Sequence, residues 1–260
     1  MFFVNPEYVV ALYNVNNLKD LLTDKIVEKD YLINYYCKNL KIDYMLKIGA
    51  LEYKKLIAQN RVKKIKRKIE LINSLEFFRE EEIDELLKKE FEKNNKLERE
   101  MFLDVNMAIE YSLKDNLSDE EIEDLNVTYS VLVRSWNPIL NTELSERKIN
   151  LYKEAEKAYS EGNIKLLERY VNIVDEDEII EQGEIKYLQE KEKKYQKLLG
   201  EVEEVLRIIK NSFPYTEKDL LIEERETRKR KDKINKETQE LEEEIKVLEK
   251  DLSKLLKDKK

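Results

Sequence analysis

The sequence contains no histidine, and this absence excludes several kinds of catalytic and metal site. Without an imidazole there is no histidine general acid or base, no Ser-His-Asp or Cys-His pair, and no histidine ligand for zinc. The single cysteine, Cys37, cannot form an internal disulfide or a thiolate cluster, and we interpret it as a half-buried thiol on a helix. We therefore expect no catalytic, cofactor-binding or metal-binding residues and a protein that is not an enzyme.

Glycine and proline are also scarce, with four and three residues respectively among 260. A many-stranded sheet needs turns, and turns use these residues in clusters with Asn and Asp. The glycines are also too widely spaced to form a glycine-rich phosphate loop. Charged residues, in contrast, make up 41% of the chain, and straight-chain residues such as Lys and Glu lose little rotamer freedom in a helix. This composition predicts an all-α, elongated protein with a thin core.

The chain lacks the features of a membrane or secreted protein. No apolar run approaches the roughly 20 residues that a membrane-spanning helix requires, and the first residues have neither the basic flank nor the long apolar segment of a signal peptide. The net charge of −8 favours solubility and opposes nonspecific binding to nucleic acid. We expect a cytoplasmic protein that does not associate with membranes.

Two segments have the apolar spacing of three and four residues that is typical of a coiled-coil seam. The first seam has a single lapse, at Lys55. Its seam residues are Ile48, Leu51, Ala58, Val62, Ile65, Ile69 and Ile72. The second seam, in the last helix, consists of Ile234, Leu241, Ile245, Leu248, Leu252 and Leu255.

The boundaries of the other helices follow from caps and breakers. Asn5 followed by Pro6 predicts a helix that begins at Pro6 and runs to about Tyr36, before a corner at residues 39–43. A helix is predicted at 76–114, with an interruption at residues 94–95. Ser118 and Glu121 form a capping box that opens a compact segment. The acidic run at 175–178 is interpreted as complementing the dipole of the following helix, rather than as a calcium site.

These patterns predict three consecutive parts. Residues 1–115 and 175–260 are the helical arms of an antiparallel stalk, and residues 116–174 are a small helical domain inserted in the middle. The two seams are flanked by opposite charges, which select partners in coiled coils. The first is flanked by Lys54, Arg61, Lys66 and Lys68, and the second by Glu242, Glu244, Glu249 and Asp251. We expect these helices to pack together within one chain, or alternatively between two chains in a homodimer.

The inserted segment resembles helices II and III of a J domain, the DnaJ-like co-chaperone module. Tyr129, Leu132 and Trp136 match the apolar and aromatic positions before its signature loop, and the third helix is matched by Tyr152, Ala155, Ala158 and Tyr159. With residues 43–53 and 212–216, the whole chain resembles a family of bacterial proteins that flank a J-like domain with long helical arms. This resemblance implies a chaperone-related protein that binds other proteins.

The signature loop departs from the family pattern. The resembled module carries His-Pro-Asp, where this chain has Asn137, Pro138 and Ile139, and its basic second helix is reduced to Arg134. We predict that the chain does not stimulate a DnaK-type ATPase. The loop is interpreted either as an ordinary turn, with Asn137 as a cap and Ile139 as a hydrophobic plug, or as a retained protein-binding loop. The candidate residues of the J-like loop and core are Tyr129, Leu132, Arg134, Trp136, Asn137, Pro138, Ile139, Tyr152, Ala155 and Tyr159.

Two basic runs, at 61–68 and 225–233, are candidate anion-binding surfaces. Both are also consistent with solvated helix faces, and neither is interleaved with aromatic residues that would stack on bases. In the second run, Glu224, Thr227 and Lys231 occupy seam positions, so we expect that part of the helix to be poorly buried. The candidate residues are Arg61, Lys63, Lys64, Lys66, Arg67, Lys68, Arg225, Arg228, Lys229, Arg230, Lys231 and Lys233.

Taken with the resemblance, the sequence favours a noncatalytic protein-interaction scaffold or adaptor, whose partner is another protein that the sequence does not identify. The alternative is a nucleic-acid-associated accessory protein that uses the two basic runs.

Overall fold

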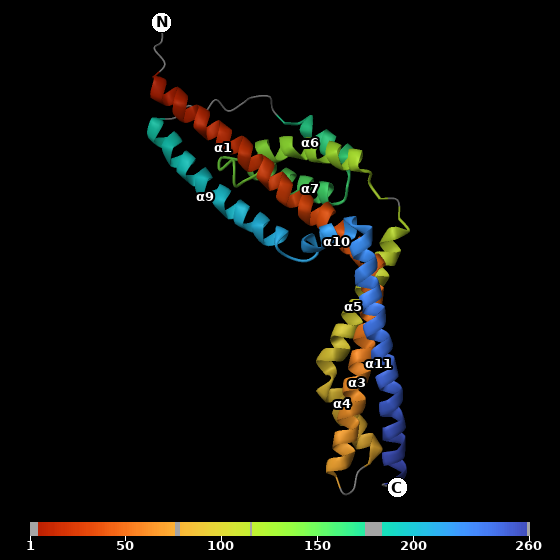
Figure 1. The fold of residues 1–260 in the computed structure, drawn as a ribbon. Coiled ribbons are helices and arrows are strands. Elements are labelled where there is room, and N and C mark those ends of the chain that lie inside the picture. The colour runs from red at the N-terminus through yellow and green to blue at the C-terminus, as the bar shows by residue number, and fades with distance from the viewer. Residues whose placement is uncertain (1–4, 76–78, 115, 175–183, 259–260) are drawn as a thin grey trace. The chain divides into compact units, whose positions relative to one another are not determined.

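The computed structural model describes residues 5–75, 79–114, 116–174 and 184–258. These ranges contain helices and their connections but no strand, so the all-α prediction is confirmed. The chain divides into two compact units (Figure 1), each made of two separate stretches of sequence. The first unit consists of Met1–Lys38 and Asp115–Thr216, and the second consists of Asn39–Lys114 and Glu217–Lys260.

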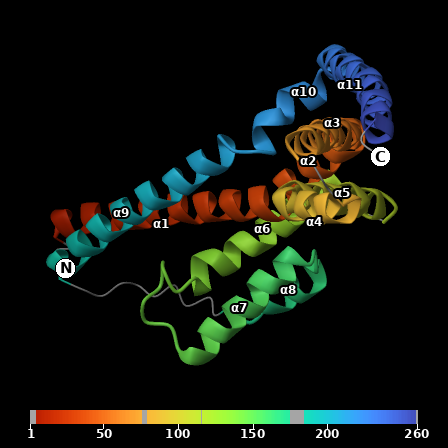
Figure 2. The same cartoon turned by 90° about the horizontal axis from the view of Figure 1, so that it is seen from below.

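The first unit is a bundle built around one long helix. Its elements are α1 (Pro6–Tyr31), the π-helical turn η1 (Leu32–Tyr36), α6 (Asp119–Trp136), α7 (Glu146–Ser160), α8 (Ile164–Val171) and α9 (Ile185–Lys210). Helix α9 lies along one side of α1 and α6 lies along another, with α7 and α8 packed on α6 (Figure 2). Helix α1 begins as predicted, because Asn5 accepts a hydrogen bond from the backbone N–H of Glu7 and Pro6 occupies the first turn.

The second unit contains the long seam helices. Its elements are α2 (Cys37–Tyr44), the π-helical turn η2 (Met45–Gly49), α3 (Ala50–Ser74), α4 (Glu80–Glu90), α5 (Glu92–Ser112), α10 (Lys218–Ile222) and α11 (Glu224–Asp258). A 3₁₀ turn, η3 (Tyr215–Glu217), precedes α10. Helices α3 and α11 lie side by side along much of their length, and α4 and α5 pack against α3.

The predicted corner at residues 39–43 is wrong. The chain remains helical from Pro6 to Ser74, with the two π-helical turns η1 and η2 in place of a break. No glycine or proline lies between 37 and 48 to end the helix, and Leu40 and Ile42 pack against a core cluster of the second unit. A π-helical turn winds wider than an α-helical turn and so shifts which residues face the core, and this lets one helix contribute to both units.

The predicted third helix is also corrected. The described part of 76–114 forms two helices that meet at Phe91, rather than one helix interrupted at 94–95. Helix α5 runs through both asparagines because their side chains have partners. Asn94 donates to the Asn60 side chain at 2.9 Å, and Asn95 accepts from Lys64 at 2.7 Å. A satisfied amide no longer competes with the helix backbone for hydrogen bonds.

The two compact units do not coincide with the three consecutive parts expected from the sequence, because each unit combines two separate stretches of the chain. The segment 116–174 does not have a core of its own. Its buried side chains form one cluster with residues of α1 and α9. The acidic run at 175–178 lies outside the described residues.

The predicted pairing of the two seams within one chain is confirmed, but the predicted antiparallel arrangement is wrong for these two helices. Glu52, near the start of α3, pairs with Arg230 near the start of α11, and Ile72, near the end of α3, clusters with Leu252 near the end of α11, so the two helices run parallel. Ala58 and Val62 of α3 form a buried cluster with Ile245 of α11. The flanking charges pair as expected, with Lys54–Glu242 at 3.2 Å, Arg61–Glu249 at 2.5 Å and Lys66–Glu244 at 2.6 Å. Lys55, the lapse in the first seam, forms an ion pair with Glu237, so its position between the helices is filled by a charged contact.

Candidate functional site

The J-like segment is organised by two well-capped helices. The Ser118 hydroxyl accepts a hydrogen bond from the backbone N–H of Glu121, and the Glu121 carboxylate accepts one from the backbone N–H of Ser118. This confirms the predicted capping box and fixes where α6 begins. Helix α7 begins at a second cap, where the Ser145 hydroxyl accepts from the backbone N–H of Lys148.

Most of the predicted J-like residues meet in one place. The buried members of the set are Tyr129, Leu132, Trp136, Asn137, Tyr152, Ala155 and Tyr159. They pack against Leu22 of α1 and Tyr35 of η1, and against Leu188 and Tyr195 of α9. These partners from outside the segment were not assigned to this site from the sequence, because spacing along a chain does not show which helix covers which.

A chain of hydrogen bonds crosses this core and begins at Asn137. The Asn137 amide nitrogen donates to the Tyr152 hydroxyl at 2.8 Å, and the hydroxyls of Tyr152 and Tyr129 lie 3.3 Å apart. Tyr129 donates to the Asp30 carboxylate at 3.1 Å. Because that carboxylate can only accept when ionised, the Tyr129 proton points to Asp30, and Tyr152 is the donor to Tyr129. Burial raises the pKa of both tyrosines, so they stay protonated as donors.

A second aromatic contact ties α7 to the first helical stretch. The rings of Tyr129 and Tyr159 stack with centroids 4.2 Å apart, and Tyr35 meets Tyr159 edge to face at 5.3 Å. The Tyr35 hydroxyl also donates to the Tyr159 backbone carbonyl, while the Tyr159 hydroxyl donates to Asn126 at 2.5 Å. Such aromatic pairs add about 0.5–1.5 kcal/mol beyond their burial. The tyrosines therefore act as structural members of the core.

The loop after α6 is an ordered turn closed by Asn137. Its side-chain oxygen accepts from the backbone N–H of Ile139 at 2.8 Å, and its backbone carbonyl accepts from the N–H groups of Leu140 and Asn141. The predicted capping role of Asn137 is confirmed. The predicted plug is wrong, since Ile139 is 52% exposed and Leu140 is 1% exposed. The tight turn at Asn137 places Ile139 outside and returns the chain so that Leu140 enters the core.

The outside of this loop is held by α1 and α9. The Tyr195 hydroxyl donates to the Leu140 carbonyl at 2.5 Å, and Lys19 donates to the Asn141 side chain at 2.8 Å. Arg134, the remaining basic residue of α6, forms an ion pair with Asp20 of α1 at 2.6 Å. Of the three positions that correspond to the signature loop, only Asn137 is buried by contacts within the chain, whereas Pro138 is half-buried and Ile139 is exposed.

The first basic run lies on α3, where acidic and amide groups surround it. Besides the two pairs with α11, Arg67 contacts Glu90 at 3.0 Å, and Lys68 contacts Asp84 at 2.7 Å. Lys64 and Lys68 also line a shallow depression of about 350 Å³ between α3 and the start of α5. Only Lys63 in this run is exposed without an ion pair or amide contact among the described residues. This run is therefore the solvated, paired helix face that was one of its two interpretations.

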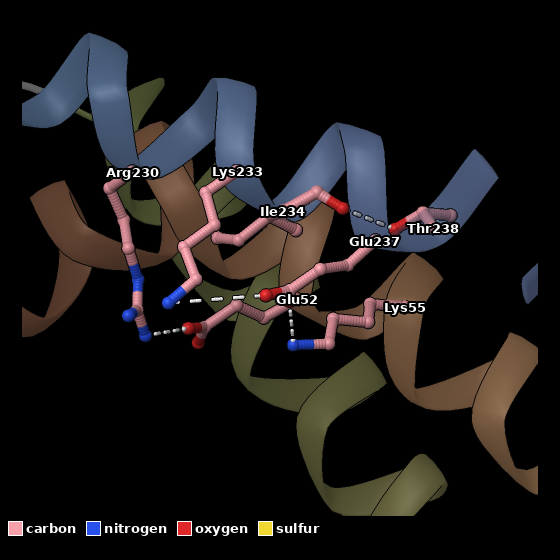
Figure 3. A network of polar contacts seen from close by, with 7 residues as sticks. All are labelled: Glu52, Lys55, Arg230, Lys233, Ile234, Glu237 and Thr238. Carbon is pink, nitrogen blue, oxygen red and sulfur yellow. Dashed lines mark hydrogen bonds and ion pairs between the residues drawn. The ribbon is translucent and has the colours of Figure 1, made fainter. Parts of the chain in front are cut away.

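The second basic run lies at the start of α11 and is partly engaged in the same way. Figure 3 shows Arg230 reaching the Glu52 carboxylate, 2.9 Å away, and Lys233 directed at Glu237, 4.0 Å away. Arg228 and Lys229 pair with glutamates of their own helix. The expectation of poor burial here is wrong at Thr227, which is 7% exposed and donates to the Leu220 carbonyl. Its hydroxyl gives the seam a polar contact with α10 in place of an apolar one.

Helix α5 presents large apolar side chains to solvent. Met101, Val105 and Ala108 face α3 or the adjoining core, whereas several other apolar residues are about half exposed. They are Leu97, Phe102, Leu103, Met107 and Ile109, with exposed fractions of 45–56%. An exposed set of this kind on one helix is typical of a binding surface.

Comparisons with protein-family models, with curated proteins and with solved structures return no match for this chain. Its possible function therefore rests on the residues themselves and on the resemblance that they carry. Among the described residues, no helix is long and apolar enough to cross a membrane. The described residues offer two features for interaction, the exposed apolar flanks of α5 and the unpaired cations of the long helices.

Proposed function

We propose that this chain is a noncatalytic protein-interaction scaffold or adaptor of the cytoplasm. On this proposal it derives from a J-domain co-chaperone, with a degenerate J-like segment at 116–174 and long helical arms, and it does not stimulate a DnaK-type ATPase. The observation that carries the proposal is the exposed apolar surface of α5.

The apolar surface of α5 has two flanks. Phe102 and Ile109 lie seven residues apart on one flank, and Leu103 and Met107 lie four residues apart on the other. Residues at these separations share a helix face. Burying one such side chain completely contributes roughly 1.5–3 kcal/mol, and about half of each remains exposed, so a partner that covers the two side chains of one flank gains about 1.5–3 kcal/mol. This surface supports protein binding more than it supports any chemistry.

The loop contacts support the second part of the proposal. Asn137 is buried and bonded to Tyr152 and Ile139, so it is not presented to a partner as a loop side chain. Ile139 is exposed but carries no charge, whereas the loop of the resembled module offers a carboxylate at that position. A DnaK-type chaperone would therefore find neither the charged loop nor a basic α6 face.

The experiment is a comparison of captured partners by tagged wild type and variants, with crosslinking in extract of cells that express the protein. The double variant Leu103→Glu/Met107→Glu places two charges on one α5 flank. The matched control is Val127→Glu, because Val127 is 63% exposed on α6 and the change has the same chemistry. We expect wild type and control to capture a common set of proteins that the α5 variant loses. Identical sets from all three proteins would contradict the assignment to α5.

The alternative function, nucleic-acid association through the two basic runs, is not favoured by the contacts of the first run. Most of the cations in the run at 61–68 are paired with carboxylates or amides of the second unit. Recovery of nucleic acid rather than protein in the capture experiment would overturn the scaffold proposal.

A further inference from the structure

The outward side of α11 carries a row of eight cations, only three of which belong to the basic run at 225–233. An α-helix turns about 100° per residue, and at that rotation the eight side chains of this row point within about 60° of a common direction perpendicular to the helix axis. That direction is opposite to the buried Thr227, Ile234, Thr238 and Ile245. We call this row the outward basic stripe. Its members, all exposed, are Arg225, Arg228, Lys229, Lys236, Lys246, Lys250, Lys254 and Lys257.

The stripe remains positively charged because most acidic residues of α11 lie on other sides of the helix. The acids that pair with α3, such as Glu242, Glu244 and Glu249, lie on the flanks of the helix. Of the acidic residues of α11, Asp232, Glu240, Glu243 and Asp258 share the outward side with the eight cations. Two cations of the stripe, Arg228 and Lys229, form ion pairs with glutamates of α11. The other six form none within the described part of the chain, in contrast to the run on α3.

The chemistry of the stripe fits a polyanion better than an acidic helix. A helical protein partner needs an apolar seam, since exposed ion pairs contribute only about 0–1 kcal/mol each. The outward side offers one large apolar residue, Val247. A nucleic acid needs no such seam, because release of its condensed counterions supplies the binding free energy.

The form of the polyanion follows from three further observations. Residues 224–258 contain no aromatic side chain to stack on an unpaired base, which disfavours single strands. The net charge of −8 opposes approach to any polyanion, but it opposes an extended anionic bilayer more than a rod, because a rod can contact the stripe alone. The row from Arg225 to Lys257 spans about 48 Å at 1.5 Å per residue, and a duplex presents one charge per about 1.7 Å along its axis.

We propose that the outward basic stripe of α11 binds the phosphate backbone of double-stranded nucleic acid without sequence specificity. This surface is separate from the apolar flanks of α5 and goes beyond the scaffold function. Its cations act as point charges, so contact is to phosphates rather than to base edges.

The test measures fluorescence anisotropy of a labelled DNA duplex of about 40 base pairs across a salt series. Contact with six to eight phosphates predicts a slope of log affinity against log salt of about −5 to −7. The triple variant Lys246→Gln/Lys250→Gln/Lys254→Gln is expected to reduce that slope by about 3 and to weaken binding at least tenfold at low salt. Lys→Arg changes at the same three positions should preserve binding.

The matched control removes three exposed lysines from the first unit, in Lys153→Gln/Lys157→Gln/Lys165→Gln. It changes the net charge equally and should leave binding within about twofold, because none of the three lysines belongs to the stripe. Circular dichroism of each variant verifies helix content. No binding by the wild type at low salt, or equal loss in the control, would overturn the proposal. Stripe-dependent binding to phosphatidylserine vesicles but not to duplex would instead assign the stripe to membranes.

Discussion

The hydrogen bond between Asn137 and Tyr152 can be tested by a double-mutant cycle. Asn137→Ala removes the bond to the Tyr152 hydroxyl and the bond from the Ile139 backbone N–H. Each bond contributes about 1 kcal/mol, and the N–H loses its partner close to the core. Asn137→Ala should therefore lower the free energy of unfolding of the first unit by about 2–3 kcal/mol.

The second arm of the cycle is Tyr152→Phe. This change removes the hydroxyl from the chain that joins Asn137 to Tyr129, and it leaves the Asn137 amide buried without that acceptor. We expect a loss of about 1–2 kcal/mol. Since the two single changes remove one shared bond, the double variant should cost about 1 kcal/mol less than their sum.

The assay is urea unfolding followed by the fluorescence of Trp136, the only tryptophan in the chain. It is 1% exposed and lies next to Asn137, so its signal reports the first unit rather than the whole chain. Asn150→Ala, a change at an exposed position on α7, is the control and should be close to neutral. Additivity within about 0.3–0.5 kcal/mol would refute the bond as a coupled element of the core.

Three further predictions concern charge and the loop. Arg61→Glu should lower the midpoint of thermal unfolding in low salt, and adding Glu249→Arg should restore it. The decrease should be small, because an exposed ion pair contributes about 0.2–1 kcal/mol. If the two substitutions change the midpoint independently of each other, the pairing is contradicted. Partial desolvation and the Asp30 charge raise the pKa of the Glu156 carboxyl, although the residue is exposed overall. Ionisation of this carboxyl therefore destabilises the first unit as pH rises through that pKa. Glu156→Gln should stabilise the first unit slightly at neutral pH and not below about pH 4, whereas Glu168→Gln should have no such effect. Steady-state ATP hydrolysis by a DnaK-type chaperone should be unchanged by this chain, and a stimulation that Pro138→Ala abolishes would show that the loop is functional.

The seams of α3 and α11 were predictable because each depends on periodicity and flanking charge. The spacing of Ala58, Val62 and Ile245 marks the buried side of each helix, and opposite flanking charges identify the partner. The helix starts at Pro6 and Asp119 were equally readable, since a cap depends on neighbouring side chains. The continuous helix through 39–43 was not, because two π-helical turns change the register without leaving a mark in composition.

The candidate site was predictable only in part. The resemblance to a J domain indicated that Tyr129, Leu132, Trp136 and Tyr152 share a core, and the turn role of Asn137 followed from its position before Pro138. The exposure of Ile139 and the burial of Leu140 depend on how the chain leaves that turn. The contact from Tyr195 to the loop joins residues 55 positions apart, and no local pattern encodes it.

The sequence by itself determined the helical class, the caps and the charge complementarity of the two seam helices, because each is a property of residues within a few turns of one another. Tertiary structure decided which cations remain available. Arg61 and Lys66 belong to the denser basic run, yet they face Glu249 and Glu244 across the α3–α11 contact, while Lys246 and Lys250 stand apart from any run and lie on the outward side. Charge density along a chain is local, but neutralisation depends on what another helix brings within about 4 Å.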